Sequence, residues 1–330
     1  MKNKGAGWLF KTVFTTAAFL SAVDGLNRLT ARFGEAKLKT FRRNENDWAI
    51  NIYKSRYGNL RYKKAGRGAP LLLLHGLDGQ EGLNEWRENL AALSRHFTVY
   101  SLEFPGYGFS DKPEITYSSY LFSTVVADFL TDIVKGSAYV AASGSACGVC
   151  LGAHILNPAY FRRIILISPT GAGSSTLPTS KIVKGLLRLP ILSTTLYNII
   201  HSKSRALAAL RSLYSPCEPL SDQLKDHADQ RRLPVFHNPK GARQLTLSAM
   251  YGHLNTDLRH LIKNAALPIH IIWGGSDKLN PLSTFKTLTE AAGREITLTV
   301  FKGAYSFPHR EQPEEFVKVC RWFFRHNRPK

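Results

Sequence analysis

The chain has 330 residues, of which 44% are hydrophobic and 21% charged, with 25 Gly and 16 Pro. This composition excludes collagen-like, coiled-coil and wholly disordered proteins, and the length allows one large domain or two modest ones. Four cysteines are too few and too unevenly spaced to staple such a chain, so we expect no disulfide scaffold and a cytoplasmic location.

The net charge of +20 is concentrated near the N-terminus. Residues 1–66 hold 14 Lys and Arg against 4 Asp and Glu, a net +10. Such an excess favours a polyanionic partner, either a nucleic acid or an anionic membrane face. Because no nucleic-acid-binding module is recognisable and the charge lies beside an apolar segment, we expect a membrane surface and no nucleic acid.

The apolar segment lies within residues 1–45 and runs from Trp8 to Val23. Lys11 interrupts the run and Asp24 ends it, which leaves too few apolar residues for a clean membrane span. We favour a helix that lies on an anionic membrane surface, because basic residues flank the run on both sides. A helix packed on the protein's own body and a spanning or signal segment remain as alternatives.

After residue 47 short apolar runs alternate with helical patterns. We predict strands at Trp48–Tyr53, Asn59–Lys63, Pro70–Leu74, Phe97–Leu102, Ala138–Ala142, Arg163–Ile167, Pro268–Trp273 and Thr297–Phe301. Helices are predicted at Asn84–Ser94, Ser118–Val134, Cys147–Leu156 and Pro313–Phe324. This alternation predicts an α/β protein, a mostly parallel sheet flanked by helices.

The alternation stops between residues 170 and 265, where the chain is rich in Leu, Ser and Arg and has helical patches. We therefore expect a core made of residues 46–169 and 266–330, with residues 170–265 inserted as a helical cap. An insertion after the sixth strand lies over the carboxyl ends of the strands, where open parallel sheets bind ligands.

Four motifs in this order resemble the α/β-hydrolase fold family. They are His75-Gly76 after the Leu-rich strand, the segment Phe104–Pro113, the segment Ile272–Asp277 with Pro281, and the segment Pro308–Phe316. The resemblance spans residues 57–325. It implies an esterase- or lipase-like site with a nucleophile on a tight strand-to-helix turn, then an acid, then a histidine base.

The nucleophile turn departs from the family pattern Gly-x-Ser-x-Gly. By its distance from the preceding strand, Ser145 takes the nucleophile position, with Ser143 and Cys147 in place of the two glycines. A second register keeps both glycines but places Ala146 at the nucleophile position, which makes the site inert. A serine there argues against the branches of the family that need a carboxylate nucleophile.

The resemblance assigns Asp277 as the acid, and a carboxylate that caps the following helix is the alternative. The expected histidine position holds Ser306, and a serine cannot act as a general base near neutral pH. His309 is therefore our candidate base. The other histidines considered are His201, His237 and His253 from the insertion.

By the same resemblance, the backbone amides of Leu77 and Ala146 would form the oxyanion pocket. No cofactor or metal is implied. Cys147 and Cys150 are three residues apart, and we interpret them as small packing residues, with a redox pair or a metal site as weaker alternatives.

Two functions are compatible with these motifs. The first is a serine hydrolase that acts on a small or lipid-like ester at a membrane surface. The alternative is a catalytically impaired homologue that binds a ligand or a protein partner. The retained Ser145, Asp277 and His75-Gly76 favour the first, and the altered turn and Ser306 favour the second.

Overall fold

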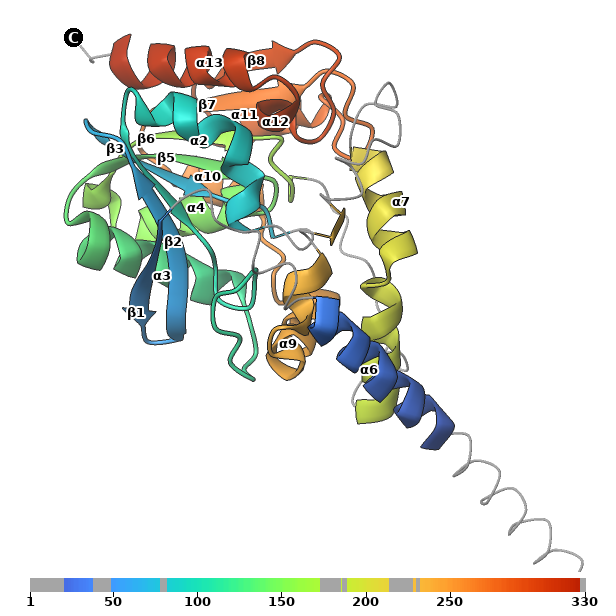
Figure 1. Cartoon of the computed structure of the whole chain (residues 1–330). Coiled ribbons are helices and arrows are strands. Elements are labelled where there is room, and N and C mark those ends of the chain that lie inside the picture. Colours follow the sequence, from blue (N-terminus) through green and yellow to red (C-terminus); the bar gives the residue numbers. More distant parts are fainter. Residues whose placement is uncertain are drawn as a thin grey trace, which may run out of the picture.

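A computed structural model describes residues 21–37, 49–77, 82–172, 185, 189–213, 228–229 and 232–326 of the chain. Within these residues the chain forms an eight-stranded sheet with helices on both faces and further helices at one end (Figure 1). The predicted α/β architecture is therefore confirmed. Most of the predicted N-terminal apolar segment, residues 8–20, lies outside the described residues.

The strand order of the sheet is β1-β2-β4-β3-β5-β6-β7-β8. The two N-terminal strands pair antiparallel with each other, β2 pairs antiparallel with β4, and all other pairs are parallel. The strands are β1 (Ile50–Ser55), β2 (Gly58–Ala65), β3 (Pro70–Leu74), β4 (Thr98–Leu102), β5 (Ala138–Ser143), β6 (Phe161–Ile167), β7 (Ile269–Gly274) and β8 (Thr297–Phe301). Each lies within three residues of its predicted bounds.

The core has two layers because the central strands are apolar on both faces. Along β3, Leu72 and Leu74 join the hydrophobic cluster on one face, whereas Leu71 and Leu73 join the cluster on the other. This alternation follows from the two-residue period of a strand, and it explains why the sequence of β3 is a continuous leucine run.

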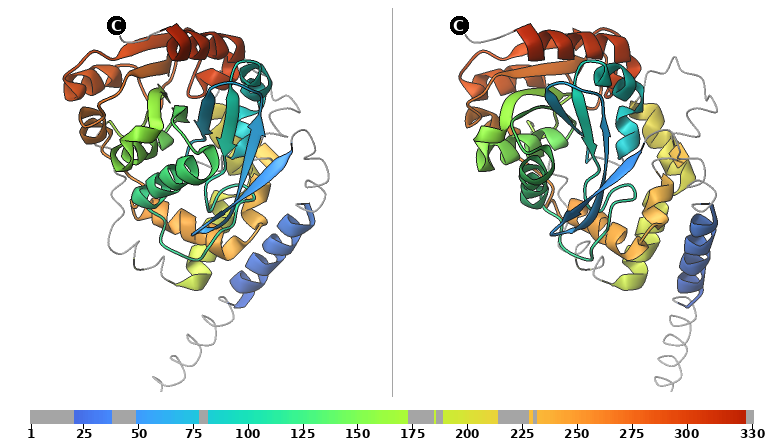
Figure 2. Two further views of the ribbon diagram at one scale, coloured as in Figure 1. Left: turned by 90° about the vertical axis from the view of Figure 1, so that its left-hand side faces the viewer. Right: turned by 60° about the vertical axis from the view of Figure 1, so that its left-hand side comes forward.

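Helices cover both faces of the sheet (Figure 2). The first face carries α3 (Ser119–Phe129), which ends in the π-helix η2 (Leu130–Val134), with α4 (Ala146–Leu156), α10 (Leu258–Lys263) and α11 (Thr284–Ala292). The second face carries η1 (Leu83–Trp86), α2 (Arg87–Ser94) and α13 (Pro313–His326). Two short helices, η3 (Pro158–Tyr160) and α12 (Pro308–Glu311), precede β6 and α13.

The predicted helical insertion lies between β6 and β7. Its described helices are α6 (Pro190–Ile200), α7 (Lys203–Leu213), η4 (Leu233–Phe236) and α9 (Pro239–Met250). They lie together at one end of the molecule, beside α12 and the carboxyl ends of the strands (Figure 1).

Residues 21–37 form a helix that packs on the insertion. Asn27 is buried and exchanges side-chain hydrogen bonds with Thr195 (3.1 Å) and Asn198 (2.8 Å) of α6. Gly34 lies so close to the ring of Phe236 that a side chain there would clash with it. Among the described residues, no helix is both long enough and apolar enough to cross a membrane.

The pH dependence of stability is predicted to depend on His270, which is 1% exposed on β7. Its two ring nitrogens lie 2.7 Å and 3.0 Å from the hydroxyls of Thr297 and Thr299, and burial lowers its pKa to about 4. Between about pH 6.5 and pH 4, His270 is therefore protonated in the unfolded chain and neutral in the folded chain. The free energy of unfolding falls as the pH decreases through this window.

In this window the unfolding free energy of the wild type should fall by up to about 1.4 kcal/mol more per pH unit than that of His270→Gln. Urea unfolding at a series of pH values measures both slopes, and the remaining titrating groups cancel in the comparison. Parallel curves for the two proteins would contradict the prediction.

Candidate active site

The carboxyl ends of the parallel strands bring five loops together. These loops follow β3 at residues 75–77, β4 at 103–112, β5 at 144–145, β7 at 275–280 and β8 at 302–306. Each carries at least one residue that the sequence motifs single out. The contacts among these loops therefore define the candidate site.

The loop after β3 is braced by His75, which is fully buried. Its Nε2 accepts a hydrogen bond from the Phe104 amide (3.1 Å), so Nδ1 carries the proton and donates to the Gly76 carbonyl (2.8 Å). The Leu77 carbonyl accepts a hydrogen bond from the Tyr107 hydroxyl (2.9 Å). These contacts fix the loop that carries Leu77 to the loop after β4.

The turn from β5 to α4 places Gly144 at its bend. The φ angle of Gly144 is +55°, in the left-handed region that glycine adopts without steric cost, whereas Ser145 has the helical φ of −71° and is the N-cap residue of α4. The Gly144 amide donates to the Ile167 carbonyl (2.9 Å) and its carbonyl accepts from the Cys147 amide (3.2 Å). The bend of the turn is therefore at Gly144, one residue before Ser145, and the role of Ser145 as nucleophile stays a prediction.

Ser145 and Leu77 are brought together by this turn. The Ser145 hydroxyl oxygen accepts a hydrogen bond from the Leu77 amide at 3.1 Å. The amide assigned by resemblance to the oxyanion pocket is thus bonded to the serine side chain itself. Ala146, the other predicted donor, is fully buried as the first residue of α4. The amide that directly follows the bend at Gly144 belongs to Ser145, and the roles of the Leu77 and Ala146 amides as oxyanion donors stay predictions.

Asp277 faces the position at which the family pattern expects a histidine. Its Oδ1 accepts hydrogen bonds from the Ser306 hydroxyl (2.9 Å) and from the amides of Leu279 and Asn280 (3.0 Å each). Its Oδ2 is buried, and no described residue forms a hydrogen bond with it. The carboxylate therefore contacts Ser306 and closes the turn after β7. It does not cap the following helix α11, whose N-cap is Ser283, and its role as acid stays a prediction.

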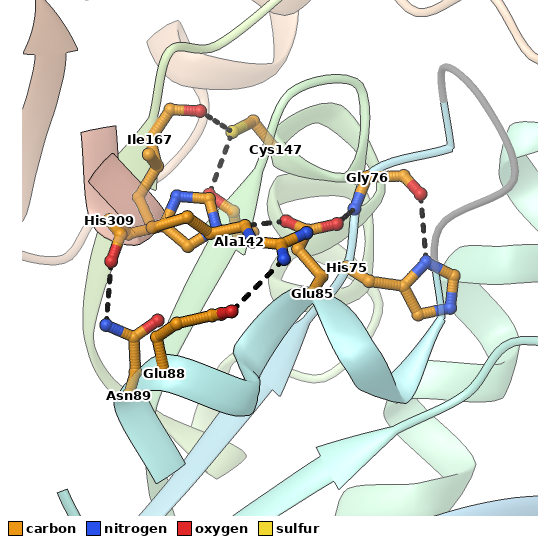
Figure 3. A network of polar contacts seen from close by, with 10 residues as sticks. His75, Gly76, Glu85, Glu88, Asn89, Ala142, Cys147, Ile167 and His309 are labelled. Carbon is orange, nitrogen blue, oxygen red and sulfur yellow. Dashed lines mark hydrogen bonds and ion pairs between the residues drawn. The ribbon is translucent and has the colours of Figure 1, made fainter. Parts of the chain in front are cut away.

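His309 lies in a different environment, on α12, with Glu85 between its ring and Gly76 of the loop after β3 (Figure 3). The residue is fully buried, and its Nε2 lies 3.3 Å from Oε1 of Glu85. The ring packs on Trp86 with 4.6 Å between centroids, and the His309 carbonyl accepts from the Asn89 side chain (2.7 Å). The described contacts of His309 thus connect it with η1 and α2, and its role as base stays a prediction.

Glu85 is a site residue that the sequence motifs do not reveal. Its carboxylate accepts a hydrogen bond from the Gly76 amide (2.8 Å), and complete burial raises the pKa of Glu85 above the ordinary value. Polar residues surround Glu85 in the sequence, so no local signal marked it as buried. Glu85 joins α12 to the loop that carries Leu77 (Figure 3).

The three histidines of the insertion have different described neighbours. His201 follows α6, lies 3.2 Å from the Thr246 hydroxyl, and has its pKa lowered to about 3 by burial. His237 packs against Phe109 with 5.9 Å between ring centroids, and His253 packs against Tyr251 at 6.0 Å.

Cys147 and Cys150 are buried residues of α4. The Cys147 thiol donates to the Ala142 carbonyl (3.2 Å), and burial raises the pKa of the Cys150 thiol far above the ordinary value. Both observations favour the packing interpretation over a reactive pair. Across the part of the chain that the structure describes, no three His, Cys, Asp or Glu side chains are placed to hold a metal ion.

A cavity of about 480 Å³ separates the insertion from the core loops. Leu77, Tyr107 and Leu279 line it from the core, and residues of α7, η4 and α9 line it from the insertion. Its lining is mainly apolar, with the cationic side chains of Lys112, Arg205 and Arg232. A volume of this size accommodates a small organic ligand.

The family model for the alpha/beta hydrolase family matches residues 71–319. The chain belongs to the α/β-hydrolase family. A pimeloyl-[acyl-carrier protein] methyl ester esterase of Aliivibrio fischeri is 23% identical to it over 267 residues, which are 80% of this chain and 97% of the relative. Such relatives are hydrolases, which supports a hydrolase-type site in this chain.

Solved structures of this family have the same fold. A serine hydrolase involved in carbazole degradation aligns with a TM-score of 0.69 and 16% identity, covering 84% of this chain and 99% of that protein. A membrane phospholipase A described as a bacterial virulence factor aligns with a TM-score of 0.66 and 18% identity, covering 95% of this chain and 97% of that protein.

The buried Glu85 is predicted to be required for the stability of the site. Glu85→Ala removes the acceptor of the Gly76 amide and leaves His309 facing a gap, so the free energy of unfolding should fall by about 2–4 kcal/mol. Glu85→Gln keeps an oxygen acceptor and should cost clearly less. Urea unfolding at pH 7 measures both variants, and equal losses would contradict the assigned role of the carboxylate.

Proposed function

We propose that this chain uses the α/β-hydrolase fold to bind a small amphiphilic ligand and does not hydrolyse esters. The observation that carries the proposal is the pair of residues at the two reactive positions. Gly144 occupies the bend between β5 and α4, where the fold presents its nucleophile, and Ser306 faces Asp277, where the fold presents its base. Glycine has no nucleophile and serine does not titrate near neutral pH.

The environment of His309 supports the same proposal. A general base must lie within about 3.2 Å of the hydroxyl it deprotonates or reach it through a water. His309 packs between Glu85, Trp86 and Phe316, and Asp277 binds Ser306 in place of an imidazole. The contacts described for His309 are thus with η1, α2 and α13, whereas the side chain that Asp277 contacts is Ser306.

Ester hydrolysis through Ser145 is the second candidate. The hydrogen bond from the Leu77 amide to the Ser145 hydroxyl favours it, because this serine lies at the position expected for an oxyanion pocket. The esterase relatives favour it too. Against it, the hydroxyl occupies the donor that a reacting carbonyl oxygen would need.

The proposed ligand-binding protein is held at an anionic membrane surface by its N-terminal segment. On helix 21–37, Leu26, Leu29 and Phe33 recur at helical spacing and are 65, 51 and 70% exposed. They face away from the side that Asn27 and Gly34 pack on the insertion, and Arg28 and Arg32 flank them. The similarity to a membrane phospholipase A over 95% of this chain supports this location.

A fluorophosphonate probe, which labels activated serines, tests the loss of hydrolysis. The wild-type protein should remain unlabelled. The double variant Gly144→Ser/Ser306→His places a hydroxyl at the bend and an imidazole beside Asp277, and it should become labelled. The matched control Gly144→Ala/Ser306→His has the same backbone strain and histidine without the hydroxyl, and should stay unlabelled. If the folded wild type is labelled and Ser145→Ala abolishes the label, the second candidate replaces the proposal.

Sedimentation with anionic lipid vesicles tests the membrane location. Replacing Leu26, Leu29 and Phe33 by Ser removes three apolar side chains from the outer face of the helix, so vesicle affinity should fall about tenfold or more. Binding should also weaken with salt. The control Ile52→Ser/Ile155→Ser removes exposed apolar residues from elsewhere and should bind as the wild type does. Unchanged binding of the helix variant would remove this part of the proposal.

A further inference from the structure

The cavity beside the insertion extends along helix α7. His201 and Arg205 line it near the start of α7, and Leu213 lines it at the end. The helical rise from Arg205 to Leu213 is about 12 Å. The Leu213 carbonyl accepts a hydrogen bond from the Ser306 amide (3.3 Å), so this end of the cavity adjoins the degenerate catalytic site. The cavity is therefore elongated along α7, with one end near Arg205 and the other near Leu213.

The end beside Ser306 is apolar. Leu77 and Leu279 line it from the loops after β3 and β7, and Leu213 lines it from α7. These side chains offer no hydrogen-bonding groups. Ser212 and Tyr107 also line the cavity, and their hydroxyls already donate to the carbonyls of Ala209 and Leu77. A ligand therefore gains affinity at this end mainly by burying apolar surface.

The other end is cationic. Arg205 and Arg232 both line the cavity there, and Arg232 is linked to the start of α7 through Asp229, which lies 3.2 Å from Arg232 and 3.9 Å from Lys203. The carboxylate of Asp229 is thus the one described beside the cations Arg232 and Lys203, and Arg205 adds a third positive charge at this end. No acidic side chain lines the cavity among the residues that the structure describes.

Arg232 carries an unsatisfied donor at this end. The residue is 9% exposed, its guanidinium lies over the ring of Phe236, and its buried Nε–H has no hydrogen-bond partner among the described residues. A buried N–H without an acceptor is costly, and an anionic acceptor relieves that cost. The third cation of the lining, Lys112, donates instead to the carbonyls of Tyr107 and Ser110.

We infer that the cavity binds a chain-shaped anionic amphiphile, with its carboxylate or phosphate at Arg205 and Arg232 and its apolar chain along α7 toward Leu77 and Leu279. This inference rests on the proposed ligand-binding function and names the class of ligand. The orientation is opposite to that of an ester substrate, whose reactive carbonyl would lie at the turn beside Ser145. In this orientation the ligand presents only its hydrocarbon end to Gly144 and Ser306.

Calorimetry with four probes of equal chain length tests the inference, each probe kept below its micelle concentration. Dodecanoate and dodecyl phosphate should bind about tenfold or more tightly than dodecanol, and dodecyltrimethylammonium should bind most weakly. Lauroyl lysophosphatidate distinguishes a lipid headgroup from a free fatty acid. It should bind more weakly than dodecanoate, because its headgroup is too large for the cationic end of a cavity about 12 Å long.

Variants then locate the two ends of the ligand. Arg205→Gln and Arg232→Gln should each weaken dodecanoate severalfold and leave dodecanol unchanged. Arg211→Gln is the matched control, because Arg211 is an exposed arginine of the same helix that does not line the cavity. Dodecanoate with a photoreactive diazirine at its terminal carbon should crosslink to the peptides that contain Leu77 or Leu279.

The outcomes separate this inference from the function on which it rests. If dodecanol binds as tightly as dodecanoate and the arginine variants change nothing, the ligand class is wrong while ligand binding stands. Crosslinking of the terminal carbon near Arg205 would overturn the orientation. If no probe binds the wild type, and the cavity-filling variant Ala209→Trp behaves identically, the proposed ligand-binding function fails as well.

Discussion

The backbone of Gly144 is the constraint on which the interpretation of this site depends. A parallel strand that passes directly into a helix must reverse direction within two residues, and here the chain does so with one residue at a φ of +55°. Any side chain with a Cβ is strained in that conformation, and active sites of this fold accept the strain because it exposes a nucleophile. With glycine at the bend the turn keeps its shape without the strain, and Ser145 is the N-cap of the regular helix α4.

Much of the fold was predictable from the sequence, because its strongest signals are local. The leucine run of β3 and the alternation of strands with helices report burial directly, and the positions of all eight strands followed from them. The pairing of Asp277 with the loop after β8 was predictable through the motif spacing. The helical nature of the insertion was also predictable, although its cavity was not, because a cavity depends on the relative placement of α7, α9 and the core loops.

The register of the turn and the environment of His309 could not be predicted in this way. Ser143, Gly144, Ser145 and Ala146 are all small, so composition does not reveal which of them bends the backbone. His309 and Glu85 are more than 200 residues apart in the sequence, and their contact exists only because α12 packs against η1. The sequence showed a histidine close to the expected position, but not that its ring packs against Trp86 of η1 and Phe316 of α13.

Under the proposed function, the arrangement explains how a hydrolase fold keeps its site geometry without the reaction. Asp277 holds the amides of Leu279 and Asn280 as well as the Ser306 hydroxyl, so its carboxylate still organises the loop after β7 when no imidazole is present. Glu85 similarly organises the loop after β3 by accepting from the Gly76 amide. These contacts fix the loops that line the cavity, and none of them requires a nucleophile in the turn after β5. Loss of the nucleophile and the base therefore removes chemistry and leaves recognition, and recognition in this cavity is determined by its apolar end and its arginines.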